Sequence, residues 1–234
     1  LQFDQTFGQI EALAQQIDQL LTCAALHPGA ILIGAVSSDA PNLLAAVQRA
    51  AEDRPVIGLV NELHSDALSA RVGVDWEDMG HALGRSLAVR FPRSGPQTTA
   101  ILLSGPVNAG WVAPLEDGLT RGLAGSAVTV TAIYGADTST SEQLRLLEAA
   151  WSQHPETDLV IGSAPAIEAA MAFLRQEAHR PFLAATYMSH SVARGLAGGQ
   201  VIAAPFDDPI EQGRMAVDAA VAAISGHKSE AQIS

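Results

Sequence analysis

Aromatic, amide and acidic side chains stand where short apolar runs of this sequence end. Trp76, for example, follows the run that contains Val72 and Val74. Open α/β sheets bind ligands at the carboxyl ends of their strands, so these positions predict a small-molecule binding site rather than a reaction centre. The candidate residues are Asn61, Glu62, Asp75, Trp76, those from Asn108 to Trp111, Tyr134 and Tyr187.

The segment around Trp76 leaves two interpretations open. Asp75 has the character of a helix N-cap, and Glu77 and Asp78 suit the positive end of a helix dipole. Capping does not require a tryptophan at the first helical position. Trp76 is therefore either a hydrophobic staple or the wall of a site. The same choice stays open for Trp111, and Tyr134 is undecided. Trp151, by contrast, is in register with neighbouring leucines and predicts a core position.

The motifs of common catalytic sites are absent from the sequence. It contains no Rossmann GxGxxG, no phosphate-binding GxxxxGK[ST] and no GxSxG nucleophile elbow. Its seven histidines include no HxH or HxxxH pair, and its single cysteine, Cys23, excludes an internal disulfide and a cysteine-based metal cluster. We expect Cys23 to be buried and inert. We predict no catalytic residue, no metal site and no cofactor, and hence a protein that is not an enzyme.

Charge and hydropathy exclude two further classes of partner. The net charge of −12 argues against nucleic acid, whose phosphates need clustered Lys and Arg. No uninterrupted apolar run reaches the roughly 20 residues of a membrane helix, so we predict no direct membrane insertion. The N-terminal residues LQFDQTFGQI lack the basic start and apolar core of a signal peptide.

Apolar runs alternate with amphipathic segments along the whole chain. The run AILIGAV (30–36) is typical of a parallel strand that is buried on both faces. Alternation at this spacing predicts an α/β fold made of βαβ units with parallel sheets. The expected strands are 30–36, 55–60, 70–74, 98–105, 127–135, 158–164, 181–187 and 200–206, and the expected helices are 4–26, 41–53, 76–90, 111–123, 141–151, 165–177, 190–199 and 207–224.

Five segments together carry a resemblance to a known family. They are VGVDWEDMGHALGRSLA, ILLSGPVNAGWVAPLEDGL, LVIGSAPAIEAAM, TYMSHSVARGL and VIAAPFDDPIEQGRMAVDAAVAAISG. They are similar to the periplasmic binding protein type I family, which includes ribose-binding proteins and LacI-type effector domains. The likeness extends over nearly the whole chain.

The resemblance implies two Rossmann-like lobes with parallel sheets, joined by a hinge, with the ligand in the cleft between them. By analogy the first lobe comprises residues 1–74 plus 207–227, and the second comprises 75–206. The family begins with a strand, a helix and a second strand before the helix at 4–26. We expect that piece to be absent from this chain, which would leave the first lobe incomplete.

Within the family, the likeness is to a periplasmic sensor protein that binds trimethylamine N-oxide and presents its closed form to the periplasmic domain of a membrane sensor histidine kinase. It implies that Trp76 and Tyr187 form aromatic walls for the three methyl groups, which carry partial positive charge. Asn61, Asn108 or the Tyr187 hydroxyl would then face the N-oxide oxygen. Asp75 would add a negative field beside the methyl groups.

Three other functions compete with this interpretation. A periplasmic sugar-binding receptor of an ABC-type transporter also uses aromatic rings, although it needs more polar groups for sugar hydroxyls. A repressor effector domain would require a DNA-binding headpiece that is not in the sequence. An enzyme on a doubly wound fold would require a nucleophile or cofactor loop that the sequence lacks.

Overall fold

The computed structural model describes residues 2–227 and 232–233. The chain divides into two compact units. The first lobe consists of Leu1–Asp75, Asn108–Trp111 and Asp208–Ser234, and the second lobe consists of Trp76–Val107 and Val112–Asp207. The sequence placed the first boundary one residue earlier, before Asp75, and did not anticipate that the short segment 108–111 belongs with the first lobe.

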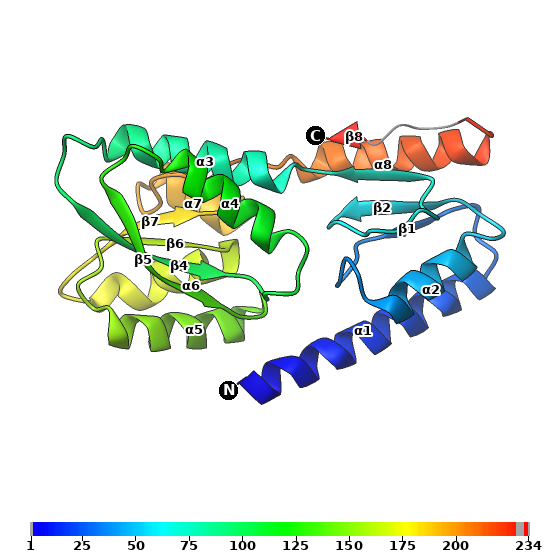
Figure 1. Cartoon of the computed structure of the whole chain (residues 1–234), viewed down its shortest axis with the longest axis horizontal. Coiled ribbons are helices and arrows are strands. Elements are labelled where there is room, and N and C mark those ends of the chain that lie inside the picture. Colours follow the sequence, from blue (N-terminus) through cyan, green and yellow to red (C-terminus); the bar gives the residue numbers. More distant parts are fainter. Residues whose placement is uncertain (1, 228–231, 234) are drawn as a thin grey trace. The chain divides into compact units, whose positions relative to one another are not determined.

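The first lobe is built on a parallel sheet with the strand order β1-β2-β3-β8. Helices α1 and α2 cover one face of this sheet and α8 covers the other (Figure 1). The strands are β1 (Ile31–Ile33), β2 (Val56–Val60), β3 (Ala70–Gly73) and β8 (Gln232–Ile233), and the helices are α1 (Gln2–Ala25), α2 (Pro41–Ala50) and α8 (Pro209–Ile224).

Neighbouring residues of β2 face opposite layers of the first lobe. Val56 packs with Leu43 and Val47 of α2, whereas Ile57 packs with small residues of α8. Side chains alternate across a strand, so a strand covered by helices on both faces must be apolar throughout. This is why the sequence shows a continuous apolar run here. The α8 residues that cover β2 and β3 are Ala216, Ala219 and Ala220.

The second lobe has its own parallel sheet, with the strand order β5-β4-β6-β7. In β4, Ile101 and Leu103 face one helical layer while Ala100 and Leu102 face the other. Its strands are β4 (Thr98–Ser104), β5 (Val128–Gly135), β6 (Leu159–Gly162) and β7 (Phe182–Ala185), and its helices are α3 (Trp76–Arg90), α4 (Val112–Gly122), α5 (Thr140–Gln153), α6 (Ala164–Phe173), the 3₁₀ turn η1 (Leu174–Gln176) and α7 (His190–Ala197).

Helices α3 and α4 meet through glycines spaced four residues apart on each helix. A Cβ at Gly80 would lie 2.0 Å from the Leu115 carbonyl oxygen, and one at Gly118 would lie 1.9 Å from the Glu77 carbonyl oxygen. Gly84 and Gly122 extend the same close approach along the two helices. The backbones are therefore in direct contact, and we call these four glycines the glycine seam.

The predicted α/β class with two parallel sheets is confirmed, but several boundaries and one strand were wrong. The segment 200–206 forms only a bridge at Ala203 with Ala184, because its backbone pairing stops after two hydrogen bonds and Pro205 has no N–H to continue it. The β8 pairing with β3 was not foreseen. Cys23 is half-buried against the first-lobe core rather than fully buried. None of the described helices has the length and hydropathy needed to cross a membrane.

Candidate ligand-binding site

Trp76 and Tyr187, the two aromatic walls implied by the resemblance, form one aromatic pair in the second lobe. Trp76 is the first residue of α3 and is 6% exposed, and Tyr187 lies just beyond the end of β7. Their ring centroids are 6.2 Å apart at an interplanar angle of 80°, which is an edge-to-face arrangement. Such a pair contributes about 0.5–1.5 kcal/mol beyond its buried area. The two rings therefore hold each other in a defined orientation.

The Tyr187 hydroxyl remains a hydrogen-bond donor at neutral pH. Burial raises the pKa of Tyr187 to about 12, and the nearby carboxylates of Asp207 and Glu168 act in the same direction. Hydrogen bonds with the Ser163 side chain and the Ala164 backbone favour the phenolate and oppose this shift. The side chain is therefore a neutral phenol at pH 7.

Two carboxylates give the surroundings of Tyr187 a negative field, and neither was proposed as a site residue from the sequence. In the sequence, Asp207 and Asp208 are the first two residues of the expected helix 207–224. The structure separates their roles: Asp208 caps α8 by accepting the Glu211 N–H at 3.0 Å, whereas Asp207 acts on Tyr187. Glu168 accepts the Ser189 hydroxyl at 2.5 Å, and Ser189 also caps α7. The sequence offered one clue to Asp207: it precedes Asp208, the N-cap of α8, so capping does not explain a second carboxylate there.

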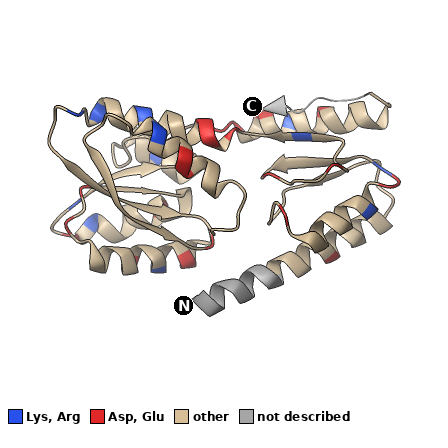
Figure 2. Cartoon of the chain, viewed as in Figure 1, with Lys and Arg blue, Asp and Glu red and all other residues tan. Residues whose placement is uncertain are grey.

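The first turn of α3 is acidic, as the sequence predicted. Glu77 and Asp78 lie in this turn and Arg90 in the last one, and Figure 2 shows red at the start of α3 and blue toward its end. Glu77 also pairs with Arg121 of α4 at 2.5 Å. Asp75 is half-buried and immediately precedes the helix, as the last residue of the first lobe's opening segment. Its proposed field beside the ligand stays a prediction.

The two amide candidates both belong to the first lobe. Asn61 directly follows β2, and its Nδ2 donates to the Ala35 carbonyl oxygen at 2.9 Å. One of its two amide hydrogens is therefore used within the protein. Asn108 is exposed in the segment 108–111. The role of both residues as ligand donors stays a prediction.

The remaining aromatic candidates have other surroundings. Trp151 is buried in the second-lobe core and stacks on His179, which confirms its predicted core position. The Tyr134 hydroxyl lies 2.9 Å from Nε2 of His154 and donates to Gln153. Trp111 is 8% exposed in the first lobe. Whether Trp111 packs as a staple or lines the site stays open, because Trp76 is buried to a similar degree.

A surface hollow of about 710 Å³ lies between α5, α6 and α7. It contains none of the residues proposed from the sequence, and its lining mixes acidic, basic and apolar groups. We therefore take Trp76 and Tyr187 as the candidate site, because this aromatic pair lies within the field of the Asp207 and Glu168 carboxylates. Among the described residues, no group of three or more His, Cys, Asp and Glu side chains is arranged to hold a metal ion.

The family model for a periplasmic binding protein domain matches residues 2–228. The chain belongs to this family. Members of the family are binding proteins rather than enzymes, which confirms the expectation drawn from the missing catalytic motifs. The confirmed fold, with its two parallel sheets, is also that of the type I periplasmic binding proteins.

Individual members of the periplasmic binding protein family resemble the chain closely. The periplasmic protein TorT of Escherichia coli (strain K12) is 35% identical over 228 residues, which cover 97% of this chain and 64% of TorT. The chain thus spans just under two thirds of the length of this relative.

Two solved structures of similar proteins cover most of the chain. The complex of the TorS sensor domain with TorT in the presence of TMAO contains a similar chain, with a TM-score of 0.81 and 31% identity over 94% of this chain and 75% of that chain. An ABC transporter solute binding protein from Bradyrhizobium sp. BTAi1 with bound bis-tris has a TM-score of 0.75 and 34% identity over 93% of this chain and 66% of that chain.

Proposed function

We propose that this periplasmic binding protein is a periplasmic sensor component that binds trimethylamine N-oxide and reports its presence to the periplasmic domain of a membrane sensor histidine kinase. The observation that carries the proposal is the edge-to-face pair of Trp76 and Tyr187 beside the Asp207 carboxylate. Support comes from the relatives, since TorT was crystallised with the TorS sensor domain in the presence of TMAO.

The chemistry of the ligand fits these groups. The N-oxide has three methyl groups with partial positive charge and one oxygen with negative charge. Each aromatic face attracts the methyl groups by about 0.5–2 kcal/mol. Asp207 strengthens that attraction, and the protonated Tyr187 hydroxyl offers a donor to the oxygen. We further propose, from the resemblance, that Asn61 and Asn108 donate to the oxygen and that Asp75 adds to the negative field.

The size of the ligand limits its affinity. With five non-hydrogen atoms and a ceiling of about −1.5 kcal/mol per atom, binding cannot much exceed about −7.5 kcal/mol, or a low-micromolar Kd. An affinity in this range suits a sensor of changing concentration. It also sets the concentration range in which a titration must be run.

Calorimetric titration with trimethylamine N-oxide tests the proposal. We expect micromolar binding by the wild type and a Kd about two- to thirtyfold weaker for Trp76→Ala, because one aromatic wall worth about 0.5–2 kcal/mol is lost. Tyr187→Phe keeps the ring and removes the hydroxyl, and Tyr134→Phe is its matched control because Tyr134 bonds to Gln153 and His154 instead. Far-UV circular dichroism checks that each variant folds. Absence of binding by the folded wild type would refute the proposal.

A second candidate is a solute receptor of an ABC-type transporter. The Bradyrhizobium relative favours it, because that protein is a transporter component of nearly the same identity to this chain as TorT. Ribose is titrated in parallel with the N-oxide. Binding of ribose alone would replace the sensor proposal by the transporter one.

A further inference from the structure

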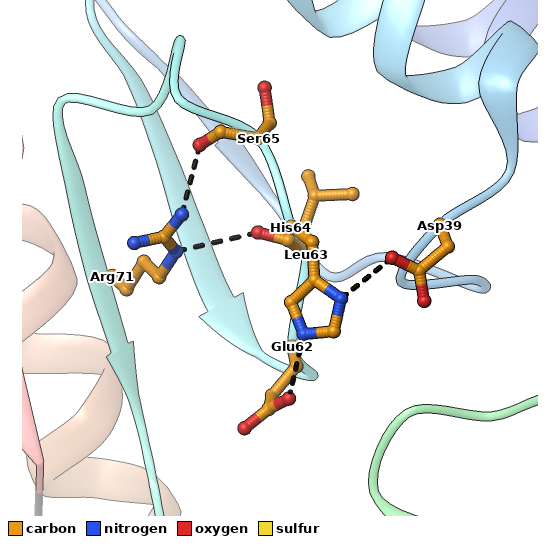
Figure 3. Close-up of polar contacts among 6 residues, drawn as sticks. All are labelled: Asp39, Glu62, Leu63, His64, Ser65 and Arg71. Carbon is orange, nitrogen blue, oxygen red and sulfur yellow. Dashed lines mark hydrogen bonds and ion pairs between the residues drawn. The ribbon is translucent and has the colours of Figure 1, made fainter.

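His64, for which the sequence predicts no role, lies between two carboxylates in the first lobe. His64 Nδ1 is 2.7 Å from Oδ1 of Asp39, and its Nε2 is 3.1 Å from Oε2 of Glu62 (Figure 3). Ionised carboxylates only accept hydrogen bonds, and a neutral imidazole donates through one nitrogen only. The protonated ring alone can satisfy both partners. We call Asp39, Glu62 and His64 the histidine clamp.

The clamp joins the two loops that follow neighbouring parallel strands. Asp39 lies in the loop after β1, whereas Glu62 and His64 lie in the loop after β2 that begins with Asn61. The backbone reinforces the connection, because the His64 N–H donates to the Ser38 carbonyl oxygen at 3.0 Å. The clamp thus fixes the loop that carries one of the proposed ligand donors.

A third segment packs against the same two loops. A Cβ at Gly110 would lie 1.8 Å from Ser38 Oγ and 3.6 Å from the Glu62 Cβ, so the backbone of 108–111 approaches both loops closely. This segment carries Asn108, the other proposed amide donor, and it has no titratable side chain. The clamp therefore lies where the two predicted amide donors of the first lobe are positioned.

The backbone next to Asn61 is strained and needs such support. Val60 has φ = 65°, in the left-handed region, and Asn61 N–H donates to the Leu59 carbonyl oxygen at 2.8 Å in a three-residue turn. A β-branched residue in this conformation costs of order 1–3 kcal/mol and persists only where the surroundings enforce it. Strain of this kind is concentrated at functional sites.

From β3, Arg71 holds the other side of the loop. Its Nη2 donates to the Ser65 carbonyl oxygen at 2.9 Å, and its Nε donates to that of Leu63 (Figure 3). These bonds go to the backbone on either side of His64 and leave both carboxylates to the imidazole. The charged groups around the ring are therefore Asp39 from the β1 loop, Glu62 from its own loop and Arg71 from β3.

We propose that His64 is a positioning residue of the ligand site, whose protonated ring ties the loop after β1 to the loop after β2 and so orients Asn61. The inference rests on the proposed function, in which Asn61 contacts the N-oxide oxygen. It predicts that binding is tighter at a pH where the clamp is closed.

The pH range follows from the partners of the ring. The hydrogen bonds to Asp39 and then to Glu62 raise the pKa of His64 above its ordinary value of 6.5, while partial burial opposes the shift. A raised pKa means that the clamp is complete below pH 6.5 and is lost as the pH rises through the pKa of the folded protein. The His64 side chain is 55% exposed, so solvent and salt screen the effect and keep it modest.

The experiment measures the Kd for trimethylamine N-oxide between pH 5.5 and 8.5 at low ionic strength. We expect the wild type to bind about threefold more weakly at the upper end. His64→Gln should bind weakly at every pH, with no pH dependence. His227→Gln, which replaces another exposed first-lobe histidine, should behave as wild type. Equal pH dependence in wild type and His64→Gln would overturn the proposal.

A measurement without ligand separates this inference from the proposed function. The Asn61 side-chain amide signal in NMR spectra should shift as the His64 ring titrates in wild type and stay constant in His64→Gln. Asp39→Asn and Glu62→Gln should each lower the pKa of the His64 ring. If the wild type fails to bind the N-oxide but these shifts occur, the proposed function fails and the positioning of Asn61 stands. If the Asn61 signal ignores the titration of His64, the positioning role is refuted.

Discussion

We predict that adding a single methyl group to the glycine seam between α3 and α4 destabilises the second lobe. In Gly118→Ala the new Cβ would lie 1.9 Å from the Glu77 carbonyl oxygen and 2.9 Å from the His81 nitrogen. Both are backbone atoms, so no side-chain rotation can relieve the contact. The helices must separate by about 1.5 Å before that contact reaches the 3.4 Å of ordinary van der Waals packing.

The size of the effect follows from two opposing contributions. Overpacking of this kind costs about 1–3 kcal/mol, and the upper end applies because the clash involves two backbones along a shared seam. Alanine in a helix interior regains about 0.8–1.0 kcal/mol relative to glycine. We expect a net loss of about 2 kcal/mol in the free energy of unfolding of the second lobe. Because Trp76 begins α3, we also expect weaker ligand binding.

Urea unfolding followed by far-UV circular dichroism and tryptophan fluorescence measures this loss. Gly213→Ala in α8 is the matched control, because a Cβ there has no neighbour within 4 Å. It should raise the stability of the first lobe by up to about 1 kcal/mol through helix propensity alone. The same substitution thus has opposite signs in two helices. A Gly118→Ala protein as stable as the wild type would refute the backbone contact.

Two further predictions concern buried polar groups. The difference in spectrophotometric titration between wild type and Tyr187→Phe should show the Tyr187 phenolate forming near pH 12. The free energy of unfolding should fall as the pH rises above 10, the pKa of tyrosine in the unfolded chain. A Tyr187 transition at pH 10 would contradict its burial. Nε2 of the buried Gln143 lies within hydrogen-bond distance of the carbonyl oxygens of Ser104, Ala136 and Asp137, which share its two hydrogens. Gln143→Glu should cost at least about 3 kcal/mol at pH 8, because a carboxylate would repel all three oxygens. Burial raises the pKa of the new carboxyl group, so the loss should shrink at pH 5 in the same urea assay.

The layers of the fold could be predicted because buried positions recur at regular intervals as apolar residues in the sequence. A strand such as β2, covered on both faces, is apolar at every position, and the helices that cover it repeat their apolar residues near every fourth position. The segment 200–206 has the same composition as a strand, yet only a bridge forms. An apolar composition indicates that a segment is buried. Strand pairing also needs the free edge of a neighbouring strand and a series of backbone N–H donors, and Pro205 lacks an N–H.

The site could be predicted only in part. The sequence placed Trp76 and Tyr187 at the ends of elements, and the topology brings them together in one lobe. The separate roles of Asp207 and Asp208 were hidden, because one carboxylate caps α8 and its neighbour raises the pKa of Tyr187. The glycine seam was visible in the four-residue spacing of Gly80 and Gly84. The spacing of these glycines cannot show that α4 is the helix that packs against them.

The way the chain is divided between its two lobes has a consequence for biosynthesis. Apart from the segment 108–111, the second lobe is one continuous stretch, whereas the first lobe is finished only by α8, near the end of the chain. Chains fold from the N-terminus as they emerge, so the second lobe can complete its core while α8 has yet to be synthesised. Until Ala216 and Ala219 arrive, the face of the first sheet that carries Ile57 and Val72 stays uncovered. The nascent chain therefore exposes an apolar sheet face for as long as the whole second lobe takes to be made, and this interval is when it is most prone to aggregation and has most need of a chaperone.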